Sequence, residues 1–396
     1  MCTYVQNERV GIFYSMKNKI YTVGFGAAAL LVLVAVGSYV YVTHAIQPSL
    51  VLASGDADTD ENSADPQQLD AAVALAALAP KTHYQVSSTT PQFVLLSFDG
   101  SKSVDMLDET LAFEHKMQGE GKPLHFTYFI NAAYFLTNDT ASVYHAPAHA
   151  AGVSNIGFSN TAADIPLRVA AFNTAYAEGN EIGSHSVGHF DGSTWSYAEW
   201  KQEFDSFTSL MANVPQDNPT QQISAPTFLA SIHGFRAPQL GVNANLYRVL
   251  SDERFVYDAS DVAADRWPTK DAGGVWHIPL SVVYLGSDPR PVVAMDYNLW
   301  TRQSGAKNVD SAGTPQWEAD KAEVENAYLA YFNRNYSGDR APMVIGNHFS
   351  KWNDGVYWQA MQDFAEEVCG KPEVQCVTFS TLVEYLEATG TPAVVQ

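Results

Sequence analysis

Short apolar runs alternate with helical patterns along the chain from residue 93 onward. Apolar runs of this length, bounded by turn-forming residues, are typical of buried strands. The sequence predicts such strands at 93–98, 125–130, 182–184, 235, 256–257, 276–279, 292–295 and 343–345. It predicts helices at 103–118, 165–178, 197–212, 321–333 and 354–367. This alternation indicates one α/β domain around a parallel sheet, either open or closed into a barrel.

The amino-terminal part has a different pattern, because residues 21–43 contain no charged side chain. This length suffices for a helix that spans a bilayer. Basic residues in the preceding tail, 1–20, and an acidic segment afterwards place the tail in the cytoplasm and the remainder outside. The alternative is a cleavable signal peptide with a small-x-small site at 43–45, which would release a secreted protein. The apolar stretch is long for a signal peptide, so we favour an uncleaved anchor.

Residues 44–88 are predicted to link this anchor to the folded domain at 89–390. The segment 55–70 carries six acidic residues and no basic ones, which is typical of a solvated linker. The alanine-rich stretch 69–79 that follows is predicted to be helical. The linker would hold the folded domain away from the membrane.

Composition and charge restrict the partners of this domain. The chain of 396 residues is 46% hydrophobic and 12% aromatic, which is typical of a globular protein. Its formal net charge of -21 argues against binding to nucleic acid or to anionic lipid headgroups. In an oxidising compartment Cys369 and Cys376 can close a small loop as a disulfide, although two unbonded thiols are the alternative. Cys2 would be a free cytoplasmic thiol.

Several polar residues directly follow predicted strands. They are Asp99, His185 with His189, Arg236 and His348. In parallel α/β folds ligands bind at the carboxyl ends of strands, so we expect these side chains to share one site. Alone, each has a structural interpretation as a turn cap, an ion-pair partner or a buried histidine.

Together these residues are suited to metal-assisted hydrolysis of an amide or ester. His185 and His189 are four residues apart, which places both rings on one face of a helical turn, where they can hold one metal ion. Asp99 is suited to take a proton from water, and His348 to protonate the leaving group. Arg236 can hold Asp99 ionised. No phosphate-binding loop and no nucleophile elbow stand out.

Four segments resemble, in order, the motifs of polysaccharide deacetylases, the NodB-homology domains of carbohydrate esterase family four. They are Leu96-Ser-Phe-Asp-Gly100, His185-Ser-Val-Gly-His189, Arg236-Ala-Pro-Gln239 and Gly346-Asn-His348. The resemblance covers roughly residues 90–388, and the segment from His348 to Cys376 is similar to the chitin-deacetylase-like branch. It implies a distorted (β/α) barrel of the NodB type. It also implies a hydrolase that removes acetyl groups from a polysaccharide such as chitin or peptidoglycan.

The resemblance also implies roles for individual residues. His185 and His189 would bind a divalent metal ion, usually zinc, and Asp99 would be the general base. Arg236 would tether that base, and His348 would be the general acid. Two further roles are implied outside this set. Asp296 resembles an aspartate that orients the acid histidine, and the backbone N–H near Gln239 would help to stabilise the oxyanion.

This chain departs from the family pattern at Gly100, where a second aspartate, a metal ligand, is expected. Either Asp99 remains the base and the ion lacks its third protein ligand, or Asp99 becomes the ligand beside the two histidines. Asp105 or a water could then fill the vacant role. Gln239 also replaces an aromatic residue. The alternatives to a deacetylase are therefore a catalytically inactive carbohydrate-binding protein of the same fold and, less favoured, a hydrolase of another linear C–N bond.

Overall fold

A computed structural model of the chain describes residues 82–395. The predicted tail at 1–20, the predicted anchor at 21–43 and most of the predicted linker at 44–88 lie outside this range. Within the described range no helix combines the length and the apolar character that a membrane span requires.

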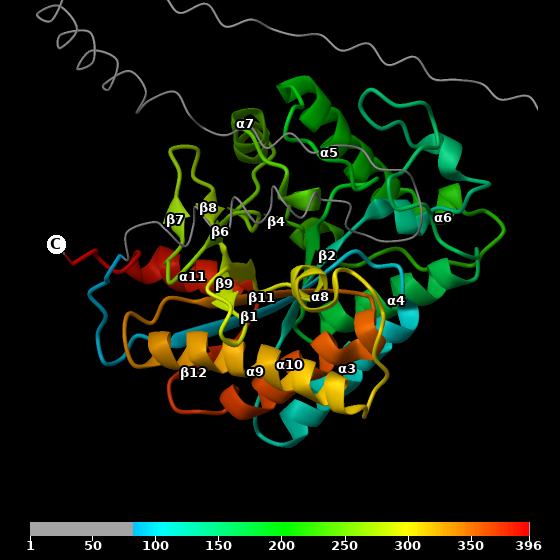
Figure 1. The fold of residues 1–396 in the computed structure, drawn as a ribbon. Helices are drawn as coiled ribbons and strands as arrows, with labels where there is room; N and C mark the ends of the chain where they lie inside the picture. The colour runs from blue at the N-terminus through cyan, green and yellow to red at the C-terminus, as the bar shows by residue number, and fades with distance from the viewer. Residues whose placement is uncertain (1–81, 396) are drawn as a thin grey trace, which may run out of the picture. The chain divides into compact units, whose positions relative to one another are not determined.

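A mainly parallel, curled sheet forms the centre of the domain (Figure 1). Its strand order is β11-β1-β2-β3-β4-β5-β8-β7, and β12 also pairs with β1. The strands are β1 Gln92–Asp99, β2 Phe126–Ile130, β3 Glu181–Ser184, β4 Gly234–Phe235, β5 Tyr257–Asp258, β7 Thr269–Lys270, β8 Trp276–His277, β11 Met343–His348 and β12 Val374–Cys376. All neighbours are parallel except β7 and β8. The predicted α/β domain around a parallel sheet is therefore confirmed.

A smaller sheet of three strands stands beside this one. It consists of β6 Val262–Ala263, β9 Leu280–Tyr284 and β10 Pro291–Val293, in the order β10-β9-β6. The predicted strand at 292–295 belongs here and pairs antiparallel with β9, because a short connection joins the two strands as a hairpin. A bridge between Met295 and Gly346 links this sheet to the edge strand β11. Among the described residues no continuous ladder closes the ring, so the predicted barrel is an incomplete one.

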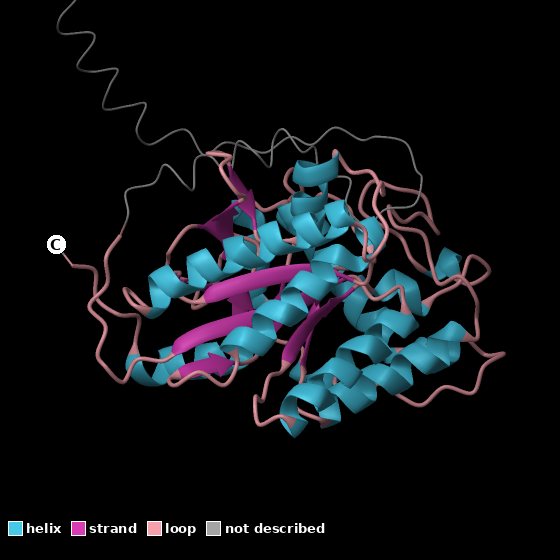
Figure 2. Cartoon of the chain, turned by 60° about the horizontal axis from the view of Figure 1, so that its bottom comes forward, coloured by secondary structure: helices cyan, strands magenta, loops and turns pink. Residues whose placement is uncertain are grey.

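Helices cover the strands on both sides (Figure 2). They are α3 Val104–Gly119, α4 Asp164–Ala177, α5 Tyr197–Ala212, α6 Val214–Asp217, α7 Ala244–Asp252, α8 Asp296–Ser304, α9 Pro315–Tyr336, α10 Trp352–Val368 and α11 Phe379–Thr389. Side-chain caps set several starts: Ser196 begins α5 with a capping box, and Thr314 followed by a proline begins α9. The latter cap explains why α9 starts before the helix predicted at 321–333.

Two hydrophobic clusters fill the space on either face of β1. Val94, Leu96 and Phe98 belong to one cluster, and the alternate residues Phe93 and Leu95 belong to the other. All eight residues of β1 are buried. A strand covered on both faces reads as a continuous apolar run, which is why this strand could be predicted.

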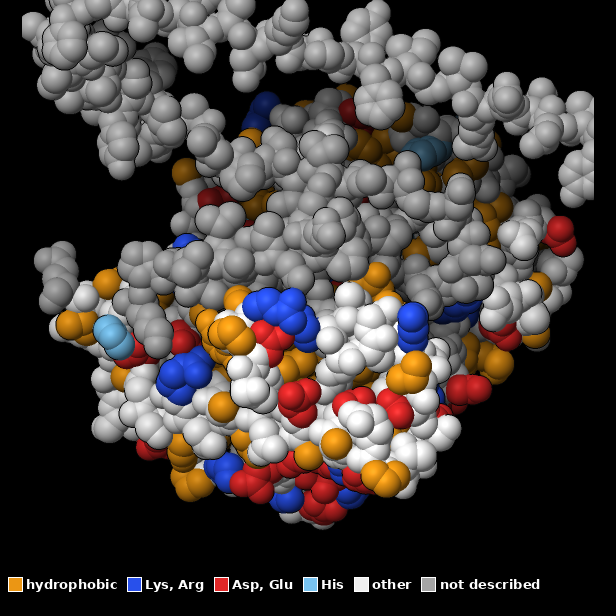
Figure 3. All heavy atoms as spheres, viewed as in Figure 1, with side chains coloured by type: hydrophobic (Ala, Val, Ile, Leu, Met, Phe, Trp, Pro, Cys, Tyr) orange, Lys and Arg blue, Asp and Glu red, His pale blue; other side chains and the backbone are white. Residues whose placement is uncertain are grey.

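The disulfide predicted between Cys369 and Cys376 is present and ties the end of α10 to β12. On the lower part of the surface in Figure 3, acidic and basic side chains are interspersed around α9, α10 and α3. Ion pairs such as Lys321–Asp363, with 2.8 Å between Nζ and Oδ2, join these helices.

Candidate active site

Asp99 and Arg236 form a buried ion pair at the carboxyl edge of the sheet. Asp99 is the last residue of β1, and Arg236 directly follows β4. The Arg236 Nη1 donates to Asp99 Oδ1 at 2.7 Å and to Ser97 Oγ at 2.9 Å. Its guanidinium carbon lies 4.4 Å from the ring centre of Phe129. The guanidinium is fixed by its contact with the aromatic ring and by its hydrogen bonds to two acceptors. The arginine therefore holds the carboxylate in one position.

His348 lies beside Asp99, because the two residues are partners in the parallel ladder of β1 and β11. Its Nδ1 donates to Asp296 Oδ1 at 2.7 Å, and its backbone N–H donates to Asp296 Oδ2 at 2.7 Å. Asp296 is the buried first residue of α8. Since the carboxylate can only accept, the Nδ1 carries the proton, and the Nε2 is the atom suited to exchange protons with a substrate. The structure thus brings together the three residues Asp99, His348 and Asp296.

His185 and His189 lie in a loop after β3, not on a helical turn, so that part of the prediction is wrong. Ser186 and His189 have φ angles of 66° and 58°, which bend the loop until the two ring centroids are 5.0 Å apart. A side chain at Gly188 would meet the Tyr144 hydroxyl at 2.7 Å, so only glycine fits this turn. The loop therefore brings the two imidazoles together without a helix.

Both imidazoles are neutral. Burial lowers the pKa of His185 to about 3, and it lowers the pKa of His189 well below the ordinary value. The His185 Nδ1 donates to the carbonyl of Arg236 at 2.7 Å, so its Nε2 presents a lone pair. The buried Nδ1 of His189 has no hydrogen-bond partner among the described residues. Neutral rings with available lone pairs fit a divalent metal ion.

The three predicted ligands, His185, His189 and Asp99, do not form one cluster of closely spaced ligand atoms. Among residues 82–395 the one group of acidic and histidine side chains with ligand atoms all within 4.8 Å of one another lies elsewhere, around β5 and β8. Asp105 is exposed in the first turn of α3 and does not fill the vacant position. Gly100 has a φ of 94°, which residues with side chains rarely adopt, and its N–H donates to the Phe129 carbonyl. The residues thus fit an ion held by two imidazoles.

Glu203 is a buried carboxylate beside the site, and the sequence pattern alone does not single it out. Its buried carboxylate on α5 accepts hydrogen bonds from the Ser186 hydroxyl, the Val187 N–H at 2.9 Å and the Tyr144 hydroxyl at 2.9 Å. Burial raises the pKa of Glu203, while these donors favour its ionised form. The signal was an acidic residue inside the apolar stripe of α5, between Trp200 and Phe204. Glu203 sets the shape of the loop that carries the two histidines.

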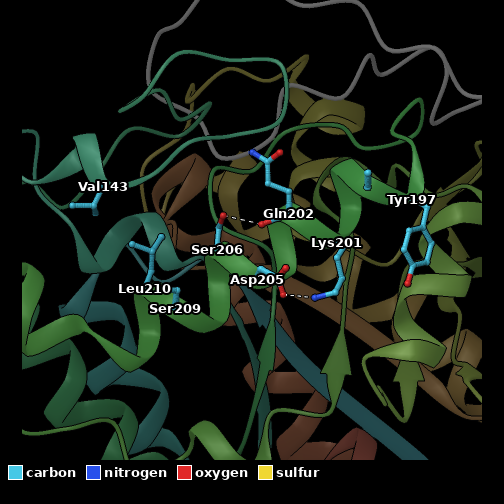
Figure 4. A pocket seen from close by; sticks show the side chains of 9 residues that line it. Val143, Tyr197, Lys201, Gln202, Asp205, Ser206, Ser209 and Leu210 are labelled. Atoms are coloured by element: carbon cyan, nitrogen blue, oxygen red, sulfur yellow. Dashed lines mark hydrogen bonds and ion pairs between the residues drawn. The ribbon is translucent and has the colours of Figure 1, made fainter.

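The opposite face of α5 is exposed and lines the surface groove shown in Figure 4. Lys201 and Asp205 pair there, with 2.5 Å between Nζ and Oδ1. None of the predicted site residues lines this groove. On the site side, Gln239 is buried, and its amide donates to the His189 carbonyl at 3.3 Å.

No protein-family model matches the chain, and no curated protein matches its sequence. The structure is similar to a putative polysaccharide deacetylase from Mycobacterium smegmatis, with 16% identity, a TM-score of 0.48 and coverage of 81% of this chain and 98% of that one. A family 4 carbohydrate esterase from Streptomyces lividans, solved in complex with acetate, has 15% identity, a TM-score of 0.39 and coverage of 77% and 98%. A CE4 family pseudoenzyme from Bacillus anthracis has 9% identity, a TM-score of 0.39 and coverage of 74% and 66%. The motifs of the chain resemble those of polysaccharide deacetylases, and the chitin-deacetylase-like branch remains a prediction.

Proposed function

We propose that the described domain is a metal-dependent hydrolase that removes acetyl groups from an N-acetylated polysaccharide such as chitin or peptidoglycan. The observation that carries this proposal is the position of Arg236. Its side chain holds Asp99, and its backbone carbonyl holds the ring of His185. Asp99 in turn lies beside His348 in the sheet. One residue therefore joins the candidate base, the candidate acid and the candidate metal ligands.

In this proposal His185 and His189 would hold a divalent ion, most simply zinc, which would supply Lewis-acid polarisation of the acetyl carbonyl and of water. Asp99 takes a proton from the attacking water, whose oxygen ends in acetate. His348 gives a proton to the leaving nitrogen, which departs as an amine. Arg236 keeps Asp99 fixed during this exchange, and Asp296 fixes the ring of His348.

A catalytically inactive carbohydrate-binding protein is the second candidate, and Gly100 favours it. Only one carboxylate stands at the end of β1, so Asp99 cannot be both a metal ligand and a free base. The φ of 94° at Gly100 is one that an aspartate adopts only with backbone strain. In this case the domain would bind a carbohydrate without turnover.

We also propose that the domain works outside the cytoplasm, anchored by residues 21–43 or secreted after their removal. The uncharged stretch and the basic tail before it support export. The disulfide between Cys369 and Cys376 supports an oxidising compartment.

Acetate release from N-acetylated chitin oligomers and peptidoglycan fragments tests the activity. We expect the purified chain with added zinc or cobalt to release acetate and free amine in equal amounts, and His348→Asn to release far less. If the folded chain binds these glycans and releases no acetate with either metal, the binding protein is the correct interpretation.

A further inference from the structure

We infer that the domain has a second divalent-metal site, formed by Asp258, Asp261 and His277 and separate from the two histidines described above. This inference is independent of the proposed deacetylase activity. The ligand would be a transition-metal ion such as zinc or manganese, because two carboxylates and one imidazole match the preference of these ions for oxygen and nitrogen donors.

The three residues come from neighbouring segments at the carboxyl edge of the sheet. Asp258 ends β5 and His277 ends β8, and the two are register partners in the parallel ladder. Asp261 lies just before β6, and its carbonyl accepts the Leu280 N–H at 2.8 Å. One candidate ligand atom from each of the three side chains lies within 4.8 Å of the others.

The distance between two of these atoms is longer than an ordinary hydrogen bond and is close to the spacing of two ligands of one ion. Asp258 Oδ2 and His277 Nδ1 face each other at 3.5 Å. Both atoms are buried, and neither makes a hydrogen bond within the described part of the chain. Two ligand atoms bound to one tetrahedral ion at about 2.1 Å lie roughly 3.4 Å apart. A buried carboxylate oxygen without a donor therefore faces a nitrogen at the spacing that two ligands would have.

Asp271 supplies the outer contact that a metal-bound histidine usually has. Its Oδ2 accepts from His277 Nε2 at 3.3 Å. With a proton on Nε2, the Nδ1 can direct a lone pair toward an ion that it shares with Asp258 Oδ2. The Tyr247 ring covers the imidazole from α7, with its centroid 4.7 Å away.

A proton is the competing occupant of this position. Burial lowers the pKa of His277, but Asp258, Asp261 and Asp271 outweigh it and raise the pKa to about 9. Without a metal the ring is therefore charged and pairs with the carboxylates. An ion would displace that proton, so metal binding at this site should release protons.

An ion here would stiffen the segment that anchors Arg236. Asp258 Oδ1 accepts from Ser260 Oγ at 2.6 Å, and the same hydroxyl accepts from the Ala237 N–H at 2.8 Å. The carbonyl of Ala259 accepts from Arg236 Nε at 3.1 Å. The site is thus structural, and it acts on the arginine through two neighbouring residues.

Counting bound ions tests this inference. The full chain and its variants are loaded with zinc, freed of excess ion by gel filtration and analysed by mass spectrometry. We expect about two ions per wild-type chain, about one in His185→Gln/His189→Gln and about one in Asp261→Asn/His277→Gln. A wild-type chain that keeps one ion, and loses none in Asp261→Asn/His277→Gln, overturns the second site.

A second measurement covers the case in which the Asp261→Asn/His277→Gln variant does not fold. In His185→Gln/His189→Gln, which lacks the first site, zinc should still raise the melting temperature by mass action, and adding EDTA should reverse the rise. No rise in that variant, at zinc concentrations that stabilise the wild type, overturns the inference. Because this variant is expected to be inactive in any case, the result does not depend on the proposed deacetylase activity.

Discussion

The histidines on the two sides of the candidate site are held in opposite ways. On one side, the Nδ1 of His348 faces the carboxylate of Asp296 at 2.7 Å. On the other side, the Nδ1 of His185 faces a neutral backbone carbonyl, and the Nδ1 of His189 has no hydrogen-bond partner among the described residues. All three rings are buried to a similar degree. Burial alone therefore does not set the role of an imidazole here.

The group that faces the Nδ1 of each ring decides whether the ring is suited to proton transfer or to metal binding. A carboxylate stabilises the positive charge that a ring acquires when it holds a second proton, so His348 is suited to deliver a proton. A neutral carbonyl stabilises such a charge much less, and burial then keeps the ring neutral, so His185 and His189 are suited to bind a metal ion. Four sets of measurements test this contrast.

The largest effect is expected from His185→Gln/His189→Gln. Metal polarisation contributes several kcal/mol, so acetate release should fall by on the order of 10³-fold or more. The measurement is acetate release at saturating zinc, with His115→Gln as a control because His115 is an exposed histidine. Unchanged activity in the double variant would remove the metal from the proposal.

His348→Asn should lower acetate release by about 10²-fold, within the range for loss of a general acid. It should leave the ion at His185 and His189 in place, which metal analysis of the same preparation checks. Asp296→Asn should produce a smaller loss with the same metal content, because it keeps the ring but removes the charge behind it. A loss of that ion in His348→Asn would contradict the division of roles.

Glu203→Gln should weaken metal binding by roughly 10- to 100-fold, as is usual when an outer contact of a ligand is lost. The new amide would place an N–H against the donors of Ser186 and Val187 and disturb the loop. A competition titration with a zinc chelator gives the affinity. Asp205→Asn, a matched carboxylate-to-amide change on the exposed face of α5, should leave it unchanged.

The smallest effect concerns pH. A neutral buried histidine binds its proton less well in the folded chain than in the unfolded one, where its pKa is about 6.5. Its contribution to stability is therefore complete above pH 6.5 and decreases as the pH falls toward the value of about 3 for His185.

For the metal-free chain, the free energy of unfolding should fall by about 1.4 kcal/mol per pH unit for each such histidine below pH 6.5. Denaturant unfolding at pH 7 and at pH 5.5, with a chelator present, measures this slope. His185→Gln should reduce this dependence of the free energy of unfolding on pH, and His348→Asn should not increase it. An equal slope in wild type and His185→Gln would show that burial does not keep His185 neutral.

The residues that could be predicted stand at the ends of strongly apolar strands. Asp99 and His348 are the last residues of β1 and β11, and the strand-end rule for parallel sheets is enough to place them together. Arg236 follows a weaker strand, and the role of Asp296 depends on the family resemblance. Patterns within short stretches of sequence thus predict most of the residues in the candidate site.

The features that escape prediction depend on contacts between distant segments. The loop of His185 and His189 takes its shape from Glu203 on another helix, so its spacing alone wrongly predicts a helical turn. The strands of Asp258 and His277 are predicted, at 256–257 and 276–279, but the register that makes these two residues partners depends on the pairing of β5 with β8. The incomplete barrel depends on the bridge from Met295 to Gly346, a pairing across a long stretch of sequence.

The turn at Gly100 has a consequence for how this chain can change over generations. A single exchange to aspartate would place a side chain on a backbone with a φ of 94°, and relaxing that backbone would break its hydrogen bond to Phe129. A second carboxylate at this position is therefore strained unless the neighbouring turn also changes.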